Sequence, residues 1–175
     1  MFWLAAFLVL ALDCNCDPAK PDTLKQRQCS LCNEAEKQPA NVRVFILKDI
    51  SPRKPNRWLA LPRSHGAGGA HHLHDMSPAE RTELWTAAIA KAKELFGPDD
   101  WGLAYNGEEV RTQCHTHIHI GRFARAAESA SGFLTVSDPS QIPAPPGKGI
   151  WIHPVAGGKL HVHFGEQITE TVLVR

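Results

Sequence analysis

The sequence lacks three features that would each place it in a broad class of proteins. Its net charge of +1 leaves no basic excess of the kind that marks non-specific nucleic-acid binding. No apolar run reaches the ~20 residues that a membrane-spanning helix needs, and no repeat recurs with a solenoid period. At 175 residues the chain is also too short for two domains of ordinary size. We therefore expect one globular domain with no nucleic-acid partner and a function set by a local site.

The chain begins with an apolar run, Met1–Leu12, that fits the hydrophobic part of an export signal, although the usual preceding positive charges are missing. Cys14 and Cys16 follow at once, as the lipid-bearing cysteine does in bacterial lipoproteins, but Asp13 stands where a small residue is expected. The alternative is an apolar helix that packs on the domain. We expect residues 1–13 to be a signal- or anchor-like segment, and the protein to be exported or membrane-attached on the periplasmic side rather than cytoplasmic.

The remaining chain alternates between strand-like runs and one clear helix. Residues 14–28 are polar and proline-containing, which favours a flexible tether. The segment Ser77-Pro78-Ala79-Glu80 predicts a helix start with a capping box, and Gly97-Pro98 ends that helix. Residues 124–149 indicate an irregular connection. Strands are expected at 42–47, 58–61, 101–105, 112–120, 149–154, 159–164 and 168–174. This order predicts an α+β fold with an antiparallel sheet.

Histidine is the unusual residue type, and three of the ten alternate in His115-Thr116-His117-Ile118-His119. In a strand, side chains two apart share a face, so the three imidazoles would stand in a row. Such a row is hard to explain as packing, and the row alone fits a structural metal site or a catalytic site almost equally. A neutral imidazole attacks phosphorus well when a neighbour fixes its tautomer.

The flanking residues favour catalysis at the middle histidine. In this register His117 would be the nucleophile, with His119 or a backbone carbonyl holding its far nitrogen. Asn106, Arg111 and Gln113 lie just upstream and could bind the non-bridging phosphate oxygens. Asn106 could equally belong to a hairpin turn, and Arg111 could be a solvated edge residue.

These motifs resemble the histidine-triad (HIT) superfamily. Residues 113–120 are similar to its His-φ-His-φ-His motif, with Thr116 an imperfect match, and residues 49–65 resemble its stretch from a nucleotide-contacting aspartate to a histidine after a proline. The resemblance covers residues 29–123. It implies a HIT-like antiparallel sheet of about five strands with flanking helices, usually a homodimer. Residues 124–175 lie beyond the resemblance, and their pattern predicts a loop and a short C-terminal β extension packed on the same domain. The resemblance also implies that His117 forms a covalent nucleotidyl-histidine, that His119 is its neighbour in the phosphate site, and that Asp49 contacts the ribose hydroxyls.

A Cys-x-x-Cys at Cys29 and Cys32 alone indicates a disulfide, a redox pair or half of a zinc site, and export favours the disulfide. Some HIT proteins, and the related galactose-phosphate uridylyltransferases, bind zinc with such a pair, the histidine after the proline and the first triad histidine. The resemblance therefore implies a closed, structural Zn²⁺ site of Cys29, Cys32, His65 and His115. Cys114 is expected to be a buried free thiol.

Two other histidine groups remain. His71, His72 and His74 are competing ligand sources, with an exposed polar loop as the preferred interpretation. His161 and His163 share a strand face near His153, and are interpreted as polar residues of a half-exposed strand, with a second metal or substrate contact as the alternative.

The substrate class follows from a narrower resemblance. Residues 111–113 before the triad, with residues 47–49, are similar to bacterial CDP-diacylglycerol diphosphatases, which are membrane-associated and release CMP and phosphatidate. The chain lacks their longer C-terminal region, and residues 49–52 resemble the branch that acts on dinucleoside polyphosphates or nucleoside phosphoramidates. We expect a HIT-type hydrolase or transferase of a nucleotide phosphoanhydride or phosphoramidate, with a nucleotide-lipid at a membrane surface as the favoured substrate. The non-enzymatic alternative is an exported zinc-binding module.

Overall fold

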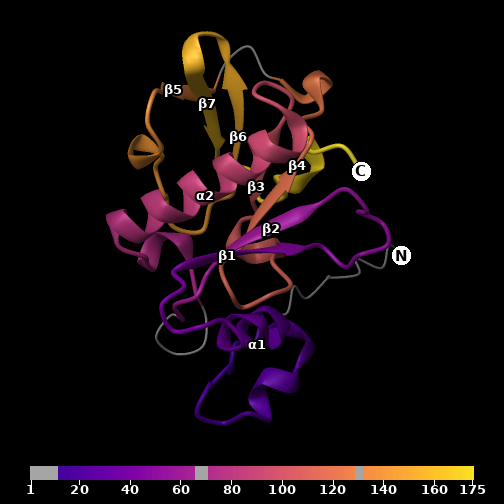
Figure 1. The fold of residues 1–175 in the computed structure, drawn as a ribbon, viewed down its shortest axis with the longest axis vertical. Coiled ribbons are helices and arrows are strands. Elements are labelled where there is room, and N and C mark those ends of the chain that lie inside the picture. Colours follow the sequence, from indigo (N-terminus) through magenta and orange to yellow (C-terminus); the bar gives the residue numbers. More distant parts are fainter. Residues whose placement is uncertain (1–11, 66–70, 129–131) are drawn as a thin grey trace, which may run out of the picture.

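The computed structural model describes residues 12–65, 71–128 and 132–175. Its centre is one antiparallel sheet of seven strands in the order β1-β2-β4-β3-β6-β7-β5 (Figure 1). The helices are α1 (Ser30–Glu36) and α2 (Pro78–Phe96). The strands are β1 (Val44–Lys48), β2 (Trp58–Pro62), β3 (Gly102–Tyr105), β4 (Ile118–Gly121), β5 (Phe133–Val136), β6 (Ile150–Val155) and β7 (Lys159–Phe164). The predicted α+β class with an antiparallel sheet is confirmed.

Local sequence signals account for the elements that were predicted well. The strands expected at 42–47 and 58–61 form as β1 and β2, and they pair antiparallel. At the start of α2 the Ser77 hydroxyl accepts a hydrogen bond from the Glu80 amide at 3.3 Å, and the Glu80 carboxylate accepts one from the Ser77 amide at 2.9 Å. This reciprocal pair satisfies two amides that the first helical turn would leave without partners. Gly97, with φ +80°, ends the helix in a conformation that glycine adopts without a steric penalty.

The sheet has more strands than the five implied by the resemblance, because the C-terminal strands extend it. Strand β6 pairs with β3, β7 pairs with β6, and β5 adds the edge beside β7. Strand β5 falls within residues 124–149, which were expected to be irregular. The free edge of β3 offers unpaired backbone groups, and a hairpin that supplies partners for them joins the sheet rather than packing on it.

Two predicted strands are wrong over most of their length. Residues 112–117 are irregular and only the last part of 112–120 becomes β4, because the Cys114 amide donates to the Gln28 carbonyl and its carbonyl accepts from the His71 amide. Residues 168–174 form a 3-10 turn, Glu170–Val172, and one isolated bridge. There the Asn106 side chain takes the amides of Thr169 and Glu170, which would otherwise be free for a ladder.

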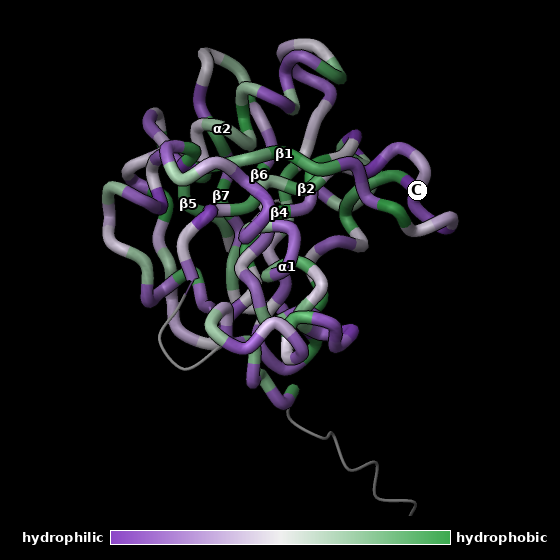
Figure 2. Tube along the Cα trace, turned by 60° about the horizontal axis from the view of Figure 1, so that its bottom comes forward, coloured by the Kyte–Doolittle hydropathy of each residue, from purple (hydrophilic) through white to green (hydrophobic). Residues whose placement is uncertain are grey.

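The two faces of the sheet differ. Helix α2 covers one face, where its apolar side chains pack against residues such as Leu103, Ile118 and Ile120. Figure 2 shows the hydrophobic stretches along the strands and the polar stretches in the peripheral loops. Successive side chains of a strand point to opposite faces of the sheet, so the residues next to these in sequence lie on the face away from α2. Across that face, His119, Ala104, Trp151 and His163 lie side by side on β4, β3, β6 and β7.

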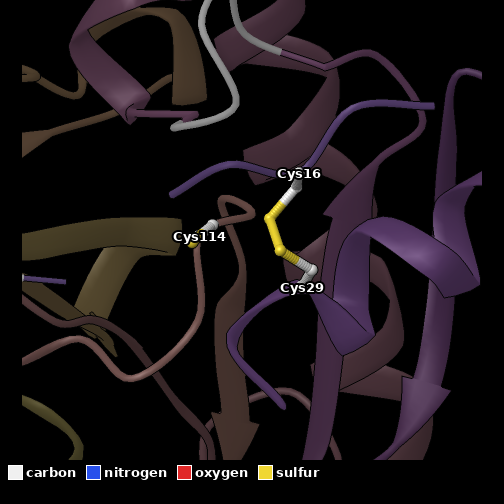
Figure 3. Close-up of side chains that lie close together, drawn as sticks. All are labelled: Cys16, Cys29 and Cys114. Atoms are coloured by element: carbon white, nitrogen blue, oxygen red, sulfur yellow. A yellow bond between two sulfur atoms is a disulfide. The ribbon is translucent and has the colours of Figure 1, made fainter. Parts of the chain in front are cut away.

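The segment expected to be a flexible tether, residues 14–28, is instead fixed to the domain. Disulfides join Cys14 to Cys114 and Cys16 to Cys29, and Figure 3 shows the second bond with Cys114 beside it. Leu24 is buried within 3-10 turns that precede α1. Two disulfides are typical of proteins from oxidising compartments. Residues 1–11 of the expected signal segment lie outside the described residues, and no helix within the described ranges is long and apolar enough to cross a membrane.

Candidate functional site

The two histidines proposed for catalysis lie together on the sheet face opposite α2. His119 is in β4, His117 precedes that strand, and their ring centroids are 4.9 Å apart in an edge-on arrangement. The Nδ1 of His117 lies 2.9 Å from the backbone carbonyl oxygen of His115. Only a protonated Nδ1 can donate to that oxygen, so Nε2 carries the lone pair. Among the described residues Nε2 has no hydrogen-bond partner, and it is not one of the fully buried unpartnered atoms.

The surroundings keep both rings neutral. Burial lowers the pKa of His117 to about 4, against the opposing effect of its bond to the His115 carbonyl. Burial also lowers the pKa of His119 well below its ordinary value, and the charges of His117 and Lys54 act in the same direction. A neutral imidazole with a fixed tautomer and a free Nε2 is the nucleophilic form.

Three charged residues that were not predicted as site residues surround the pair. Oε2 of Glu170 lies 3.8 Å from Nδ1 of His119 and 3.9 Å from Nη1 of Arg57, and it also forms an ion pair with Lys54. Arg57 is buried and donates to the carbonyls of Glu170 at 3.0 Å and Leu173 at 2.6 Å. Lys54 and Arg57 lie within the stretch 49–65 already singled out. Glu170 has no local signal, because only the return of the C-terminal segment brings it to the triad.

The four residues predicted to contact the substrate have different hydrogen-bond partners in the structure. Oδ1 of Asn106 accepts from the amides of Thr169 at 2.9 Å and Glu170 at 3.2 Å, so this side chain positions the segment that carries Glu170. Oδ1 of Asp49 accepts from the Ser51 amide at 2.8 Å and thus starts a turn. The Asp49 charge nevertheless acts to raise the pKa of His117, against the larger lowering caused by burial.

Arg111 and Gln113 are engaged by neighbouring segments. Arg111 is buried, donates to the His71 carbonyl at 3.0 Å, and has Nη2 2.8 Å from Nδ1 of His72. It is therefore not a solvated edge residue, and its charge acts to lower the pKa of His117. The Gln113 amide accepts from Ser30 Oγ and donates to the Arg27 carbonyl, both at 2.9 Å, so it connects this loop to the start of α1.

Three of the four predicted metal ligands come together. One ligand atom each of Cys32, His65 and His115 lies within 4.8 Å of the others, contributed by α1, the loop after β2 and the loop before β4. Nε2 of His115 donates to the Pro62 carbonyl at 2.7 Å, and its Nδ1 is buried with no partner among the described residues. Burial raises the pKa of the Cys32 thiol to about 11. A buried thiol and an orphaned imidazole nitrogen are a donor set that suits Zn²⁺.

The prediction of Cys29 as the fourth ligand is wrong. Its sulfur is bonded to that of Cys16, so neither the Cys2His2 site nor a Cys29–Cys32 disulfide is formed. The expected free thiol of Cys114 is likewise wrong, because it is bonded to Cys14. The Cys-x-x-Cys spacing favoured Cys29 together with Cys32, whereas the folded N-terminal segment brings Cys16 to Cys29. Glu36, one helical turn after Cys32, has Oε1 2.5 Å from Nε2 of His65 and could complete the set.

The competing histidines are not the exposed loop that was expected. His71 is buried, its ring centroid lies 5.2 Å from that of His115, and its Nδ1 has no partner among the described residues. His72 and His74 stack on each other and face Glu108. A hollow of about 200 Å³ lies elsewhere, against β1 and β2, and no triad histidine lines it.

No protein-family model matches the chain, and no curated protein is similar to it at a significant level.

Proposed function

We propose that the protein is a HIT-type nucleotidyl hydrolase or transferase whose nucleophile is Nε2 of His117. The observation that carries this proposal is the 2.9 Å contact between Nδ1 of His117 and the His115 carbonyl oxygen, which leaves Nε2 unprotonated and unpartnered. His119 stands beside it at 4.9 Å, and Asp49 and Glu170 supply negative charge that favours a positive His117 ring. These features support a neutral nucleophile that becomes cationic during the reaction.

The reaction would take place in two steps at phosphorus. The Nε2 lone pair of His117 forms a P–N bond while the bond from phosphorus to the leaving group breaks and its electron pair departs with that group. A phosphate leaving group departs as an anion, and an amine takes a proton from water. Water then attacks phosphorus, the P–N bond breaks, its electrons return to Nε2, and one water proton passes to solvent. The carbonyl of His115 holds the Nδ1 proton throughout.

The charges near the pair suit a nucleotide phosphoanhydride or phosphoramidate. Lys54, Arg57 and Arg111 act on the pKa values of His117 and His119 as nearby cations, and cations of this kind bind phosphate oxygens through charge-assisted hydrogen bonds. The favoured substrate is a nucleotide-lipid such as CDP-diacylglycerol, because the apolar run 1–12 would hold the site near a bilayer. Dinucleoside polyphosphates and nucleoside phosphoramidates are the alternatives.

Zn²⁺ fits the cluster of Cys32, His65 and His115 as a structural ion. Its chemistry there would be to favour the Cys32 thiolate and to bind the orphaned ring nitrogens. The three ligands would tie α1 and the loop after β2 to His115, whose carbonyl sets the tautomer of His117. The cluster thereby acts on the nucleophile through the backbone.

Turnover assays with CDP-diacylglycerol, diadenosine polyphosphate and adenosine phosphoramidate test the proposal. His117→Ala should reduce turnover of the active substrate by about a thousand-fold or more, since it removes the covalent step. His74→Ala, a histidine outside the pair, is the matched control and should leave turnover unchanged. Equal activity of the His117→Ala and wild-type proteins would refute the proposal.

The second candidate is an exported zinc-binding module without activity. The cluster of Cys32, His65 and His115 favours it, because a structural ion needs no reaction at His117. The wild-type protein would then turn over none of the three substrates and would still bind zinc.

A further inference from the structure

A second group of histidines converges on the C-terminal hairpin. His153 in β6 lies directly opposite His161 in β7, and His163 lies two residues further on the same face. One ligand atom of each lies within 4.8 Å of the other two. Nε2 of His153, Nδ1 of His161 and Nε2 of His163 are all buried, with no hydrogen-bond partner among the described residues. The side chains of His153 and His163 are less than a tenth exposed.

Each of the three rings is held in place by an aromatic neighbour. Phe123 stacks on His153 with centroids 4.3 Å apart, and Phe133 stacks on His161 at 3.8 Å. Trp151 stacks on His163 at 3.5 Å with only 5° between the planes. Stacking restricts rotation of each imidazole about its side-chain bonds, so the direction of its nitrogens is set before any ligand arrives.

The remaining contacts resemble the surroundings of metal-bound imidazoles. Nδ1 of His153 lies 3.2 Å from the Pro154 carbonyl oxygen and can donate to it, which fixes the tautomer that leaves Nε2 as an acceptor. Oε1 of Glu128 lies 3.9 Å from Nε2 of His153 and 3.8 Å from Nδ1 of His161. Three nitrogens therefore lie close to one another, and one carboxylate oxygen lies within 4 Å of two of them.

Packing alone does not account for this arrangement. A buried polar atom without a partner costs about 1–3 kcal/mol, and three such nitrogens gather here at one place. Polar residues on a half-exposed strand, as the sequence indicated, would instead direct their nitrogens to water. A cation at the common point would satisfy all three nitrogens at once.

We propose that His153, His161 and His163 bind a divalent first-row transition metal, with Glu128 as the fourth ligand. Imidazole and carboxylate donors suit Zn²⁺ and its neighbours in the series. Metal–nitrogen bonds of about 2.0–2.1 Å require the donors to close in from their present spacing. Glu128 is half exposed and can move to do so.

This site is separate from the triad and does not depend on the function proposed for it. His119, Ala104, Trp151 and His163 are neighbours on consecutive strands, so three strand spacings, about 14 Å, separate His119 from His163, and two spacings, about 10 Å, separate β4 from the strand that carries His153. A metal there would not touch phosphorus bound at His117. Four protein ligands make a closed site, which is typical of structural metals. It would tie Glu128, in the connection between β4 and β5, to the β6–β7 hairpin.

Cobalt titration of the purified protein, freed of metal by chelator, tests the assignment. We expect the Cys32→Ala protein to bind one Co²⁺ with an absorption spectrum free of thiolate charge transfer. Adding His161→Gln to that protein should weaken binding by about a hundred-fold or more, because a ligand is lost. His74→Gln in the same background is the matched control and should leave binding unchanged. No binding by Cys32→Ala protein, or equal binding after His161→Gln, would overturn the proposal.

Tryptophan fluorescence supplies a readout that is independent of stability. Co²⁺ is paramagnetic and should quench Trp151, which stacks on His163, so Trp151→Phe should retain binding but lose most of the quenching. Metal-free His161→Gln protein should melt as the parent does, because this ring is the most exposed of the three. Quenching that persists in full in Trp151→Phe would place the ion elsewhere and contradict the proposal.

Discussion

The two candidate metal clusters are built in opposite ways. Cys32, His65 and His115 come from three separate segments that meet only when the N-terminal part has folded. His153, His161 and His163 come from two paired strands, and the hairpin register alone places them together. The first cluster adjoins the proposed nucleophile, whereas the second lies two to three strands away. Histidine clusters in one protein can therefore differ in function, because the first is assembled by long-range contacts and the second by local strand pairing.

Among the changes that would affect one cluster and not the other, removal of the Cys14–Cys114 disulfide should have the largest effect. The bond closes a loop of 100 residues, so Cys14→Ser with Cys114→Ala should lower the free energy of unfolding by about 4 kcal/mol. It should weaken cobalt binding at Cys32 and spare the hairpin cluster. Urea unfolding and cobalt spectra measure both effects.

The matched control removes the Cys16–Cys29 disulfide, whose cysteines are only 13 residues apart and should contribute less. Loss of the hairpin site together with the Cys32 site would show that the two clusters are not independent.

Asn106→Ala should have the next largest effect, and only on the triad side. It leaves the amides of Thr169 and Glu170 without their acceptor, which should cost about 2 kcal/mol. Turnover should also fall, because Glu170 is no longer held near His119. Chemical denaturation and steady-state kinetics measure these changes. Asn106→Asp keeps an oxygen acceptor and should recover most of the stability, and a failure to recover it would argue against the positioning role.

Gln113→Ala should cost about 1 kcal/mol or less, since its hydrogen bonds to Ser30 and Arg27 are largely solvent-exposed. The KM for the nucleotide substrate should stay unchanged, because the amide holds α1 and does not bind phosphate. A several-fold increase in KM without loss of stability would restore Gln113 as a substrate contact.

The smallest effect is expected for His161→Gln on catalysis. Because His161 lies on β7, three strand spacings from β4, kcat should remain within about twofold of the wild-type value. Stopped-time assays on the substrate identified for the wild-type protein measure it. A large decrease in kcat without loss of stability would show that the two histidine groups act together.

Local patterns made much of the fold predictable. The capping box at Ser77, the β1–β2 pair and the hairpin at residues 150–164 all depend on signals within a few residues. What could not be predicted depends on distant partners. Residues 112–117 fail to form a strand because Gln28 and His71 take the hydrogen bonds of Cys114. The cysteine pairing follows from the folded N-terminal segment, which polar composition alone suggested would be flexible.

The same division holds for the candidate site. Alternation, the flanking residues and the HIT resemblance together singled out His117 and His119, and their rings lie 4.9 Å apart. Glu170 could not be foreseen, since it lies 51 residues beyond His119 and is brought to the site by tertiary contacts with Asn106 and Arg57. The hairpin histidines were interpreted as polar strand residues, because the sequence does not reveal that their nitrogens converge.

The most direct test of the account is rapid-quench mass spectrometry of the wild-type protein with CDP-diacylglycerol, diadenosine polyphosphate and adenosine phosphoramidate. We expect a nucleotidyl adduct that forms within one turnover, and tandem fragmentation should place it on His117. The His161→Gln protein should form the same adduct. An adduct on another residue, or turnover with no adduct at any quench time, would contradict the central claim that His117 attacks phosphorus.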